Sequence, residues 1–250
     1  MRDPKADGVR VDGVPVDGVG VVVPARDEED SLARCLAALD RAAGAVAVPV
    51  EIVVAVNATR DRSADVARAA GATVVELPLP GVGAARAAGA SRLLEGRDAA
   101  RTWLATTDAD SVVPPGWLAH HLALAADGAD AVVGTIRLDD AELDHHTTWW
   151  RRYLGGLSRT PHAHVHGANL AVRGSLYLQV GGFAAVPAHE DLDLVTRLDA
   201  ATDRVVRTVA EPVLTSARTE GRTPRGVAHD LRAARAAPPT APPMPCPLEG

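Results

Sequence analysis

The stretch TWLATTDADSVVPPGW, residues 102–117, runs from apolar residues into two aspartates that stand one residue apart. The apolar run predicts a buried strand, and Asp108 and Asp110 project to the same side at its carboxyl end, because side chains alternate along a strand. A second Asp-x-Asp triplet, at Asp191 and Asp193, lies in a segment with helical spacing, where residues two apart do not face each other. Such triplets also arise by chance. The surrounding sequence therefore has to decide whether Asp108 and Asp110 form a site.

Composition limits the class of protein. At 250 residues, with 47% apolar and 23% charged residues, the chain has the composition of a globular protein with a sizeable core. The net charge of −6 argues against a nucleic-acid binder with a broad basic surface. Cys35 and Cys246 form neither a disulfide framework nor a metal-ligand spacing. A spanning apolar run and the apolar core of a signal peptide are both missing, so we expect a cytoplasmic protein without a transmembrane segment.

Three regions are predicted along the chain. Residues 1–18 are rich in Val, Asp and Gly and predict a flexible leader, and residues 236–250 form a proline-rich tail that is predicted to be disordered. The block between them, residues 19–235, has the size of a single domain.

The first half of this block alternates between strands and helices. Strands are predicted at 18–25, 50–57, 72–78, 101–110 and 129–138, and helices at 27–43, 60–71, 81–96 and 114–128. This alternation indicates an α/β fold with a mainly parallel sheet, in which ligands bind beyond the carboxyl ends of the strands. Polar clusters follow three predicted strand ends, at 24–29, at 57–61 and at Asp108 and Asp110. Their convergence on one edge predicts a site.

The second half is less regular. Residues 141–157 have helical spacing and include the adjacent pair Trp149 and Trp150. A strand, a short helix and a glycine turn are predicted within 164–183, and an amphipathic helix at 189–201. A strand, a turn and a second strand follow at 203–218, and a basic helix at 221–235.

Two carboxylates on one side of a strand end suit Mg²⁺ or Mn²⁺, hard cations that take further oxygen ligands from a substrate phosphate. Zn²⁺ would require His or Cys ligands, which this cluster lacks. The ion would bridge a diphosphate and neutralise charge on a departing nucleoside diphosphate. The alternative is a polar loop with solvated aspartates.

The chain resembles family 2 glycosyltransferases over residues 19–235. The segment VVVPARDEEDSLARCLAAL resembles the opening of that family, and GVGAARAAGASRLLEG followed by TWLATTDAD resembles its glycine-rich helix and Asp-x-Asp strand. HGANLAVRGSLYLQVGGF followed by HEDLDLVTRL is similar to its acceptor-side segment and Glu-Asp helix. The resemblance implies the GT-A fold, a Rossmann-like, mainly parallel sheet flanked by helices in a single globular domain. Residues 19–137 would bind the nucleotide sugar and residues 138–235 the acceptor.

The resemblance also assigns donor-side residues. The nucleoside pocket would be lined by Pro24, Ala25, Arg26 and Glu28, with Glu28 and Asn57 contacting the base, and the donor would also contact Arg86, Asp108 and Ala109. Asp108 would hold the ribose or a metal-bound water, Asp110 would bind the metal, and Ser216 and Arg218 would lie near the diphosphate. His229 is a candidate for a further metal ligand. The chain departs from the family at Asp27, where the family often has Asn, and at Asn57, where it usually has an acidic residue.

On the acceptor side, the resemblance assigns Asp191 as the general base and Glu190 as its neighbour. A sugar hydroxyl is a poor nucleophile, and a carboxylate within hydrogen-bond reach can take its proton. The alternative is that both acids only stabilise the helix N-terminus. His189 precedes the pair and is expected to tune the base. The residues expected at the acceptor are His166, Gly167, Ala168, Asn169, Trp149 and Trp150, although core packing is an equal alternative for one of the tryptophans. His162, His164 and His166 have the spacing of a metal site on a strand, but the resemblance places the metal at Asp110.

These features predict a metal-dependent glycosyltransferase that uses Mn²⁺ or Mg²⁺. It would move a sugar from a nucleotide-diphosphate sugar to a small-molecule, lipid-linked or peptide acceptor. The resemblance implies inversion at the anomeric carbon, and retention on the same fold is the alternative. One alternative is a nucleotidyltransferase, against which the acidic segment PARDEED counts, because a basic glycine-rich loop is expected there. The other is a non-catalytic GT-A protein that binds a nucleotide or a partner.

Overall fold

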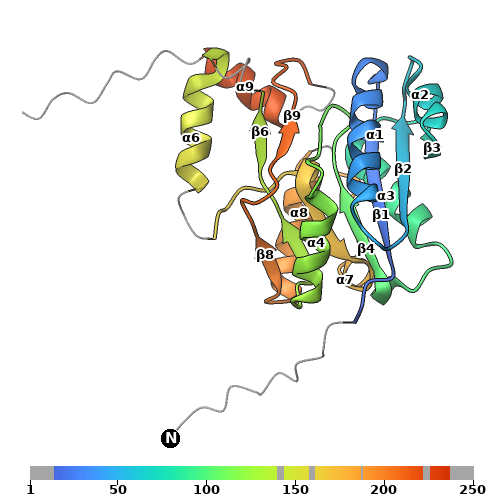
Figure 1. Cartoon of the computed structure of the whole chain (residues 1–250). Coiled ribbons are helices and arrows are strands. Elements are labelled where there is room, and N and C mark those ends of the chain that lie inside the picture. Colours follow the sequence, from blue (N-terminus) through green and yellow to red (C-terminus); the bar gives the residue numbers. More distant parts are fainter. Residues whose placement is uncertain (1–13, 140–143, 158–160, 187, 222–225, 237–250) are drawn as a thin grey trace, which may run out of the picture.

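The computed structural model describes residues 14–139, 144–157, 161–186, 188–221 and 226–236. Within these residues, one seven-stranded sheet has the order β3-β2-β1-β4-β7-β5-β8, and β6 and β9 form a two-stranded sheet (Figure 1). The strands are β1 (Gly18–Ala25), β2 (Val50–Asn57), β3 (Thr73–Leu77), β4 (Thr102–Thr106), β5 (Ala131–Val133), β6 (Ile136–Leu138), β7 (Leu170–Arg173), β8 (Val205–Arg207) and β9 (Val213–Thr215).

The large sheet is mainly parallel, and this confirms the fold class predicted from the sequence. β1 pairs in parallel with β2 and β4, β2 pairs in parallel with β3, and β5 pairs in parallel with β8. Among the described strands of this sheet, only β7 runs antiparallel, between β4 and β5. Because β1, β2 and β4 run in the same direction, the loops that leave their carboxyl ends lie at one edge of the sheet.

Helices cover both faces of the sheet. They are α1 (Glu29–Gly44), α2 (Ser63–Ala69), α3 (Val82–Leu94), α4 (Trp117–Ala126), α6 (Thr147–Leu157), α7 (Gly174–Gln179), α8 (Glu190–Ala201) and α9 (Val227–Ala236), with short 3₁₀ turns at Ala99–Arg101, Asp144–His146 and Gly167–Asn169.

The alternating side chains of β1 explain the two layers. Val19, Val21 and Val23 enter a buried cluster with α1, α2 and α4, whereas Val22 enters a second cluster with α3, α7 and α8. A strand that is buried on both faces needs this continuous apolar sequence. The core therefore lies on both sides of the sheet, and polar residues are left to its edges.

The strand predicted at 129–138 is wrong as a single element. It is divided into β5 and β6, which belong to different sheets. The break falls at Gly134 and Thr135, where the buried amide of Asn169 donates to the Thr135 carbonyl (2.9 Å). A Cβ at position 134 would lie 2.3 Å from this amide, so glycine leaves room for Asn169 at the break.

Beyond the break, the small sheet and two helices form one end of the domain. Figure 1 shows α6 and α9 beside β6 and β9, on the opposite side from β3 and α2. Tyr153 of α6 anchors this end, because its hydroxyl accepts the Ile136 backbone N–H (3.0 Å). This end of the domain thus has small apolar clusters of its own.

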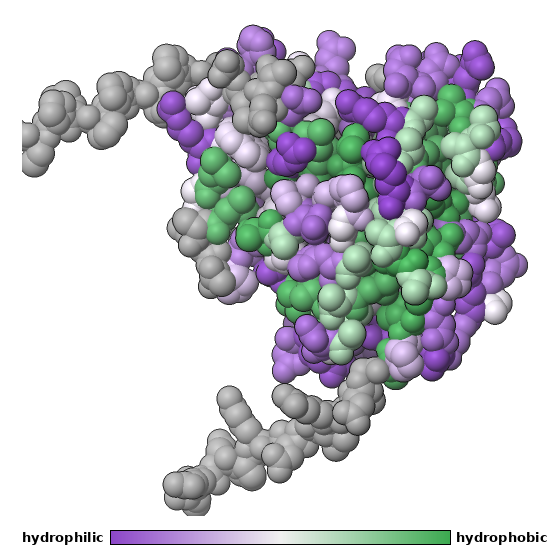
Figure 2. Space-filling view, in the orientation of Figure 1, coloured by the Kyte–Doolittle hydropathy of each residue, from purple (hydrophilic) through white to green (hydrophobic). Residues whose placement is uncertain are grey.

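The chain ends and the surface complete the description. Residues 14–17 of the predicted leader contact the domain, since Arg101 donates to Asp17 (2.7 Å) and Arg173 donates to the Val14 carbonyl (2.9 Å). Residues 1–13 of that leader and 237–250 of the predicted tail lie outside the described residues. On the face in Figure 2, apolar patches are bordered by hydrophilic residues. None of the described helices has the length and apolar character that crossing a membrane requires.

Candidate active site

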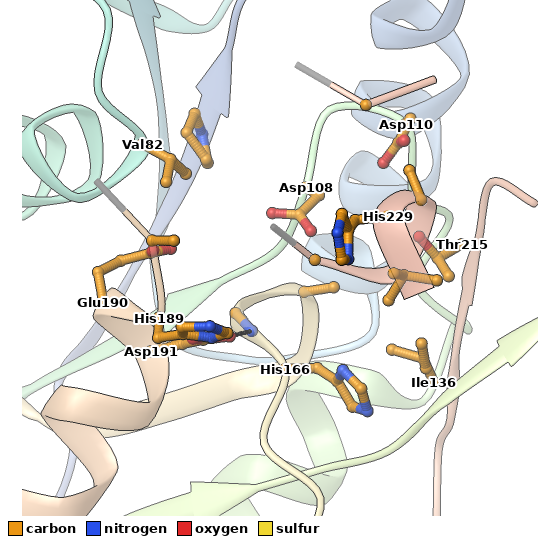
Figure 3. Close-up of a pocket in the computed structure, with 18 of the residues that line it drawn as sticks. Val82, Asp108, Asp110, Ile136, His166, His189, Glu190, Asp191, Thr215 and His229 are labelled. Carbon is orange, nitrogen blue, oxygen red and sulfur yellow. Dashed lines mark hydrogen bonds between the residues drawn. The ribbon is translucent and has the colours of Figure 1, made fainter. Parts of the chain in front are cut away.

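A cavity of about 870 Å³ opens where the carboxyl ends of β1, β2 and β4 meet the first turns of α8 and α9. Figure 3 shows Asp108, Asp110 and His229 on one side of this cavity and His189, Glu190 and Asp191 across from them. Most of the site residues predicted from the sequence line it. They are Pro24, Arg26, Glu28, Asn57, Arg86, Asp108, Ala109, Asp110, His166, Gly167, Ala168, Glu190, Asp191 and His229, together with His189, Ser216 and Arg218.

The turn after β4 carries the two aspartates of the opening stretch. The Ser111 N–H donates to the Asp108 carbonyl (3.0 Å), which closes a tight turn. The side chain of Asp108 is 37% exposed and that of Asp110 is 14% exposed. Burial, together with the neighbouring charges of Asp108 and Glu28, raises the pKa of Asp110 to about 6, although Arg218 opposes this shift. Negative charge is therefore concentrated here, and it favours a cation.

Arg86 of α3 joins the two sides of the cavity. Its guanidinium is buried and pairs with Asp108 (2.5 Å) and with Glu190, and its Nε donates to the Thr106 hydroxyl (3.2 Å). Burial raises the pKa of Glu190, and Arg86 opposes this shift. If Arg86 contacts the donor as predicted, it does so with a guanidinium that is already paired with Asp108 and Glu190.

Arg218, which follows β9, pairs with acidic residues from the loops after β1 and β4. Both of its terminal nitrogens donate to Glu28 (2.9 and 2.5 Å), and Nη2 lies 3.0 Å from Asp110. Glu28 also accepts from the Ser31 hydroxyl (2.8 Å). The resemblance predicted Arg218 near the diphosphate. Its pairing with Glu28 was not predicted, because the two residues are 190 positions apart and no sequence pattern links them.

α8 begins at Glu190, and the residue before it has left-handed backbone geometry. His189 has φ 63°, which turns the chain into the helix. Asp191 accepts the Gly167 backbone N–H (2.8 Å) through Oδ2 and the Leu192 N–H (2.8 Å) through Oδ1. These bonds fix the carboxylate of Asp191 at the cavity.

Gly167 lies where the acceptor-side loop passes Arg86. A Cβ at this position would lie 2.4 Å from Nη2 of Arg86. The absence of a side chain therefore lets Arg86 reach its partners, while the Gly167 N–H orients Asp191. His166 lines the cavity beside it, and burial lowers the pKa of His166 to about 4, against the charge of Asp191. The imidazole is thus neutral near pH 7.

The loops after β1 and β2 fasten to each other. The Asp27 N–H donates to the Thr59 hydroxyl (2.8 Å), and the Arg60 N–H donates to the Asp27 carboxylate (2.7 Å). Asp27, where the family often has Asn, therefore links the loop after β1 to the loop after β2. The amide of Asn57, in the orientation that satisfies both of its neighbours, donates to the Ala25 carbonyl and accepts the Gly81 N–H, each at 2.9 Å.

Four predicted site residues do not line the cavity. Ala25 is buried in β1, and Asn169 is buried where it accepts from Trp117 Nε1 (2.8 Å). Trp149 and Trp150 stack on Tyr153, at 5.1 and 5.3 Å between ring centroids. Both tryptophans lie on α6 and pack against apolar residues of β6 and α9. An acceptor contact was expected of these tryptophans and of Asn169, but their side chains do not line the cavity. They pack against other residues of the domain instead.

The three histidines do not form a metal site. His162 Nε2 lies 3.2 Å from the Thr208 carbonyl, and His164 Nε2 lies 3.1 Å from the Tyr153 carbonyl. Over the residues that the structure describes, no group of three or more His, Cys, Asp or Glu side chains is placed to hold a metal ion. A divalent ion at Asp110 would therefore take most of its ligands from substrate and water, which is how Mg²⁺ is usually bound beside phosphates.

Comparison with known proteins gives one family. A family model described as Glycosyl transferase family 2 matches residues 20–174. No curated protein sequence matches the chain.

Solved structures resemble the chain at low sequence identity. The mannosyltransferase PcManGT from Pyrobaculum calidifontis, in complex with GDP-Man and Mn²⁺, has a TM-score of 0.62 at 20% identity, over 87% of this chain and 60% of that one. TarS 1-349 from S. aureus, in complex with UDP-GlcNAc, has a TM-score of 0.60 at 13% identity, over 86% and 65%. Glucosyl-3-phosphoglycerate synthase from Mycobacterium tuberculosis, with Mn²⁺ and UDP, has a TM-score of 0.55 at 19% identity, over 87% and 75%. The chain thus spans less than two thirds of PcManGT and of TarS 1-349, and the likeness establishes the fold.

Proposed function

Because the chain belongs to glycosyl transferase family 2 and has the GT-A fold, we propose that it transfers a sugar from a nucleoside-diphosphate sugar to an acceptor hydroxyl. One observation carries the proposal: carboxylates at the end of β4 and at the start of α8 line the same cavity. Two reactants can meet there, one held beside Asp108 and Asp110 and the other beside Asp191. Nucleotide sugars bound to PcManGT and to TarS 1-349, which share the fold, support this class of donor.

On the donor side, the loop ends of β1 and β2 form a preformed wall. Pro24, Arg26 and Asn57 line the cavity there, and the Asn57 amide holds the Gly81 loop against Ala25. We place the nucleoside at this wall, at the carboxyl ends of the parallel strands where such sheets bind ligands.

The residues present fit a divalent ion beside the donor diphosphate. Asp110 offers a carboxylate of high local charge, Asp108 lies two residues away, and His229 lines the same cavity. Oxygen-rich sites with few protein ligands suit Mg²⁺ or Mn²⁺ that also binds phosphate. When bound, the ion would neutralise charge on the leaving nucleoside diphosphate.

On the acceptor side, Asp191 is the proposed general base. Two backbone N–H groups hold its carboxylate, and the cavity lies in front of it. It would accept the proton of the acceptor hydroxyl as that oxygen attacks the anomeric carbon. Glu190 is bound to Arg86 and is not placed to share this role. We propose a single displacement with inversion, in which Asp191 activates the acceptor hydroxyl.

Substitution of Asp191 tests the assignment. Asp191→Asn keeps the shape and removes the base, so the rate of sugar transfer should fall by about 10²–10⁴-fold. Asp193→Asn is the matched control, because Asp193 lies on the same helix, outside the cavity lining, and pairs with Arg197 (2.5 Å). Full turnover by Asp191→Asn would remove Asp191 as the base.

A donor panel tests the reaction class. The full chain would be incubated with UDP- and GDP-sugars, with Mn²⁺ and hydroxyl acceptors, and release of the nucleoside diphosphate would be measured. The anomeric configuration of the product, read by NMR, tests inversion. Pyrophosphate release from a nucleoside triphosphate would instead indicate a nucleotidyltransferase, and nucleotide binding without turnover would indicate a non-catalytic protein.

A further inference from the structure

Arg218 holds two carboxylates of the cavity through one nitrogen. Its Nη2 donates to Oε1 of Glu28 (2.5 Å) and lies 3.0 Å from Oδ2 of Asp110, while Nη1 donates to Oε2 of Glu28 (2.9 Å). The side chains of Glu28 and Asp110 are 7% and 14% exposed. A carboxylate with so little exposure to water stays ionised more readily when a positive group lies beside it, and the guanidinium of Arg218 is that group.

A divalent ion and this guanidinium need the same carboxylate. Mg²⁺ binds carboxylate oxygens at about 2.0–2.1 Å. Such an ion on Asp110 would stand only a few ångströms from Nη2, where two positive groups repel each other strongly because little water screens them. The guanidinium beside Oδ2 of Asp110 would therefore weaken the binding of a divalent ion to the same carboxylate.

We propose that Arg218 is an internal counter-ion that competes with the divalent cation for Asp110 and leaves this carboxylate when the cation binds. The inference rests on the proposed function, since the cation is the one that glycosyl transfer would use. It adds a regulatory step to that function, because the charge of Arg218 opposes cation binding until the guanidinium has moved.

The surroundings of Arg218 allow this exchange. Ser216, Arg218 and Gly221 line the cavity from a segment that follows β9 and has no helix or strand. The hydrogen bond from Nη1 of Arg218 to Glu28 does not involve Asp110, so the guanidinium can turn away from Asp110 and keep one carboxylate partner. The released guanidinium would still face the cavity, where it can meet an anionic diphosphate.

Titration of the full chain with Mn²⁺, without nucleotide, tests the competition. Free Mn²⁺ would be followed by electron paramagnetic resonance in wild type, Arg218→Met and Arg218→Lys. Loss of the competing charge should tighten Mn²⁺ binding about tenfold in Arg218→Met, with Arg218→Lys in between. Arg97→Met is the matched control, because Arg97 is similarly exposed (32% against 31%) and pairs with Glu51 outside the cavity lining.

Two further arms locate the effect. Adding Asp110→Asn to Arg218→Met should abolish the gain, because the ion then lacks its carboxylate. The proposal is overturned if Arg218→Met binds Mn²⁺ no more tightly than wild type, or if the double variant keeps the gain. Circular dichroism confirms folding, and the Lys variant keeps the test valid should Arg218→Met not fold.

A nucleotide arm separates this proposal from the proposed function. UDP or GDP should strengthen Mn²⁺ binding to the wild type if the cavity holds a nucleoside diphosphate with its cation. If it does so while Arg218→Met gives no gain, only the competition is wrong. If neither nucleotide strengthens Mn²⁺ binding in any variant, the donor site itself is wrong.

Discussion

Replacing Arg86 with methionine should destabilise the domain far more than an ordinary surface substitution. Methionine keeps the length of the side chain but removes the charge. Glu190, whose side chain is 6% exposed, and Asp108, whose side chain is 37% exposed, would then lose their common partner.

The two carboxylates contribute unequally to the expected loss. Breaking a buried ion pair by removing one partner costs about 3–5 kcal/mol, and this applies to Glu190. Asp108 is reached by water, so its share is at most about 1 kcal/mol. We therefore expect the free energy of unfolding to fall by about 4 kcal/mol at pH 7, a large part of the ~5–15 kcal/mol that holds a typical domain together.

The loss should depend on pH. Burial already raises the pKa of Glu190, and removing the cation raises it further. A carboxyl group with a higher pKa in the folded state binds its proton more tightly when folded, so the variant gains stability relative to wild type as the pH falls. The deficit at pH 5 should therefore be smaller than at pH 7.

Urea denaturation followed by tryptophan fluorescence measures this, since Trp103 and Trp117 are fully buried. Adding Glu190→Gln to Arg86→Met removes the stranded charge and should restore about 2 kcal/mol at pH 7. A loss below about 1 kcal/mol, or a loss that is equal at both pH values, would refute the reasoning, because an unpaired buried charge would then not be its cause.

Two other substitutions test packing at the site and in the core. Gly167→Ala should lower the rate of sugar transfer more than the stability, because the new Cβ would lie 2.4 Å from the Arg86 guanidinium. The kcat and the urea midpoint of variant and wild type would be compared. Equal kcat in both proteins would contradict the prediction. His121 is buried against Trp117, and burial lowers its pKa to about 3, below the unfolded value, so its contribution to stability is lost as the pH falls below about 6.5. His121→Phe should therefore lose about 2 kcal/mol less than wild type between pH 7 and pH 4.5, and parallel urea curves would count against this.

Local sequence patterns predicted the central sheet well. The apolar run of β1 and the apolar face of α1 come from neighbouring residues. The strand predicted at 101–110 is too long, because β4 ends at Thr106 and Asp108 and Asp110 lie in the turn after it. The convergence of three strand ends needed only the rule that parallel strands end at one edge. These features depend on contacts close in the chain or on the direction of strands.

Features that depend on distant partners could not be read in this way. The division of 129–138 into two strands depends on Asn169, which lies more than 30 residues further along. The sequence left an acceptor contact and core packing as equal alternatives for one tryptophan of the pair Trp149 and Trp150, and Tyr153 and the apolar residues of β6 give both of them partners in the domain. The pairing of Glu28 with Arg218 joins the first and last parts of the domain, and no spacing in the sequence encodes it.

The charges of the cavity explain why a cation belongs to the proposed reaction. Among the lining residues that the structure describes, carboxylates outnumber guanidinium groups, and Arg86 and Arg218 are already paired with them. A donor diphosphate is itself anionic, so it would meet a wall that repels it at Asp108 and Asp110. A divalent ion beside these aspartates would make the local charge attractive to the diphosphate. In the proposed exchange it would also release Arg218 from Asp110, so that the guanidinium can face the phosphates. Cation and donor should therefore each strengthen the binding of the other, because each removes the repulsion that the other meets.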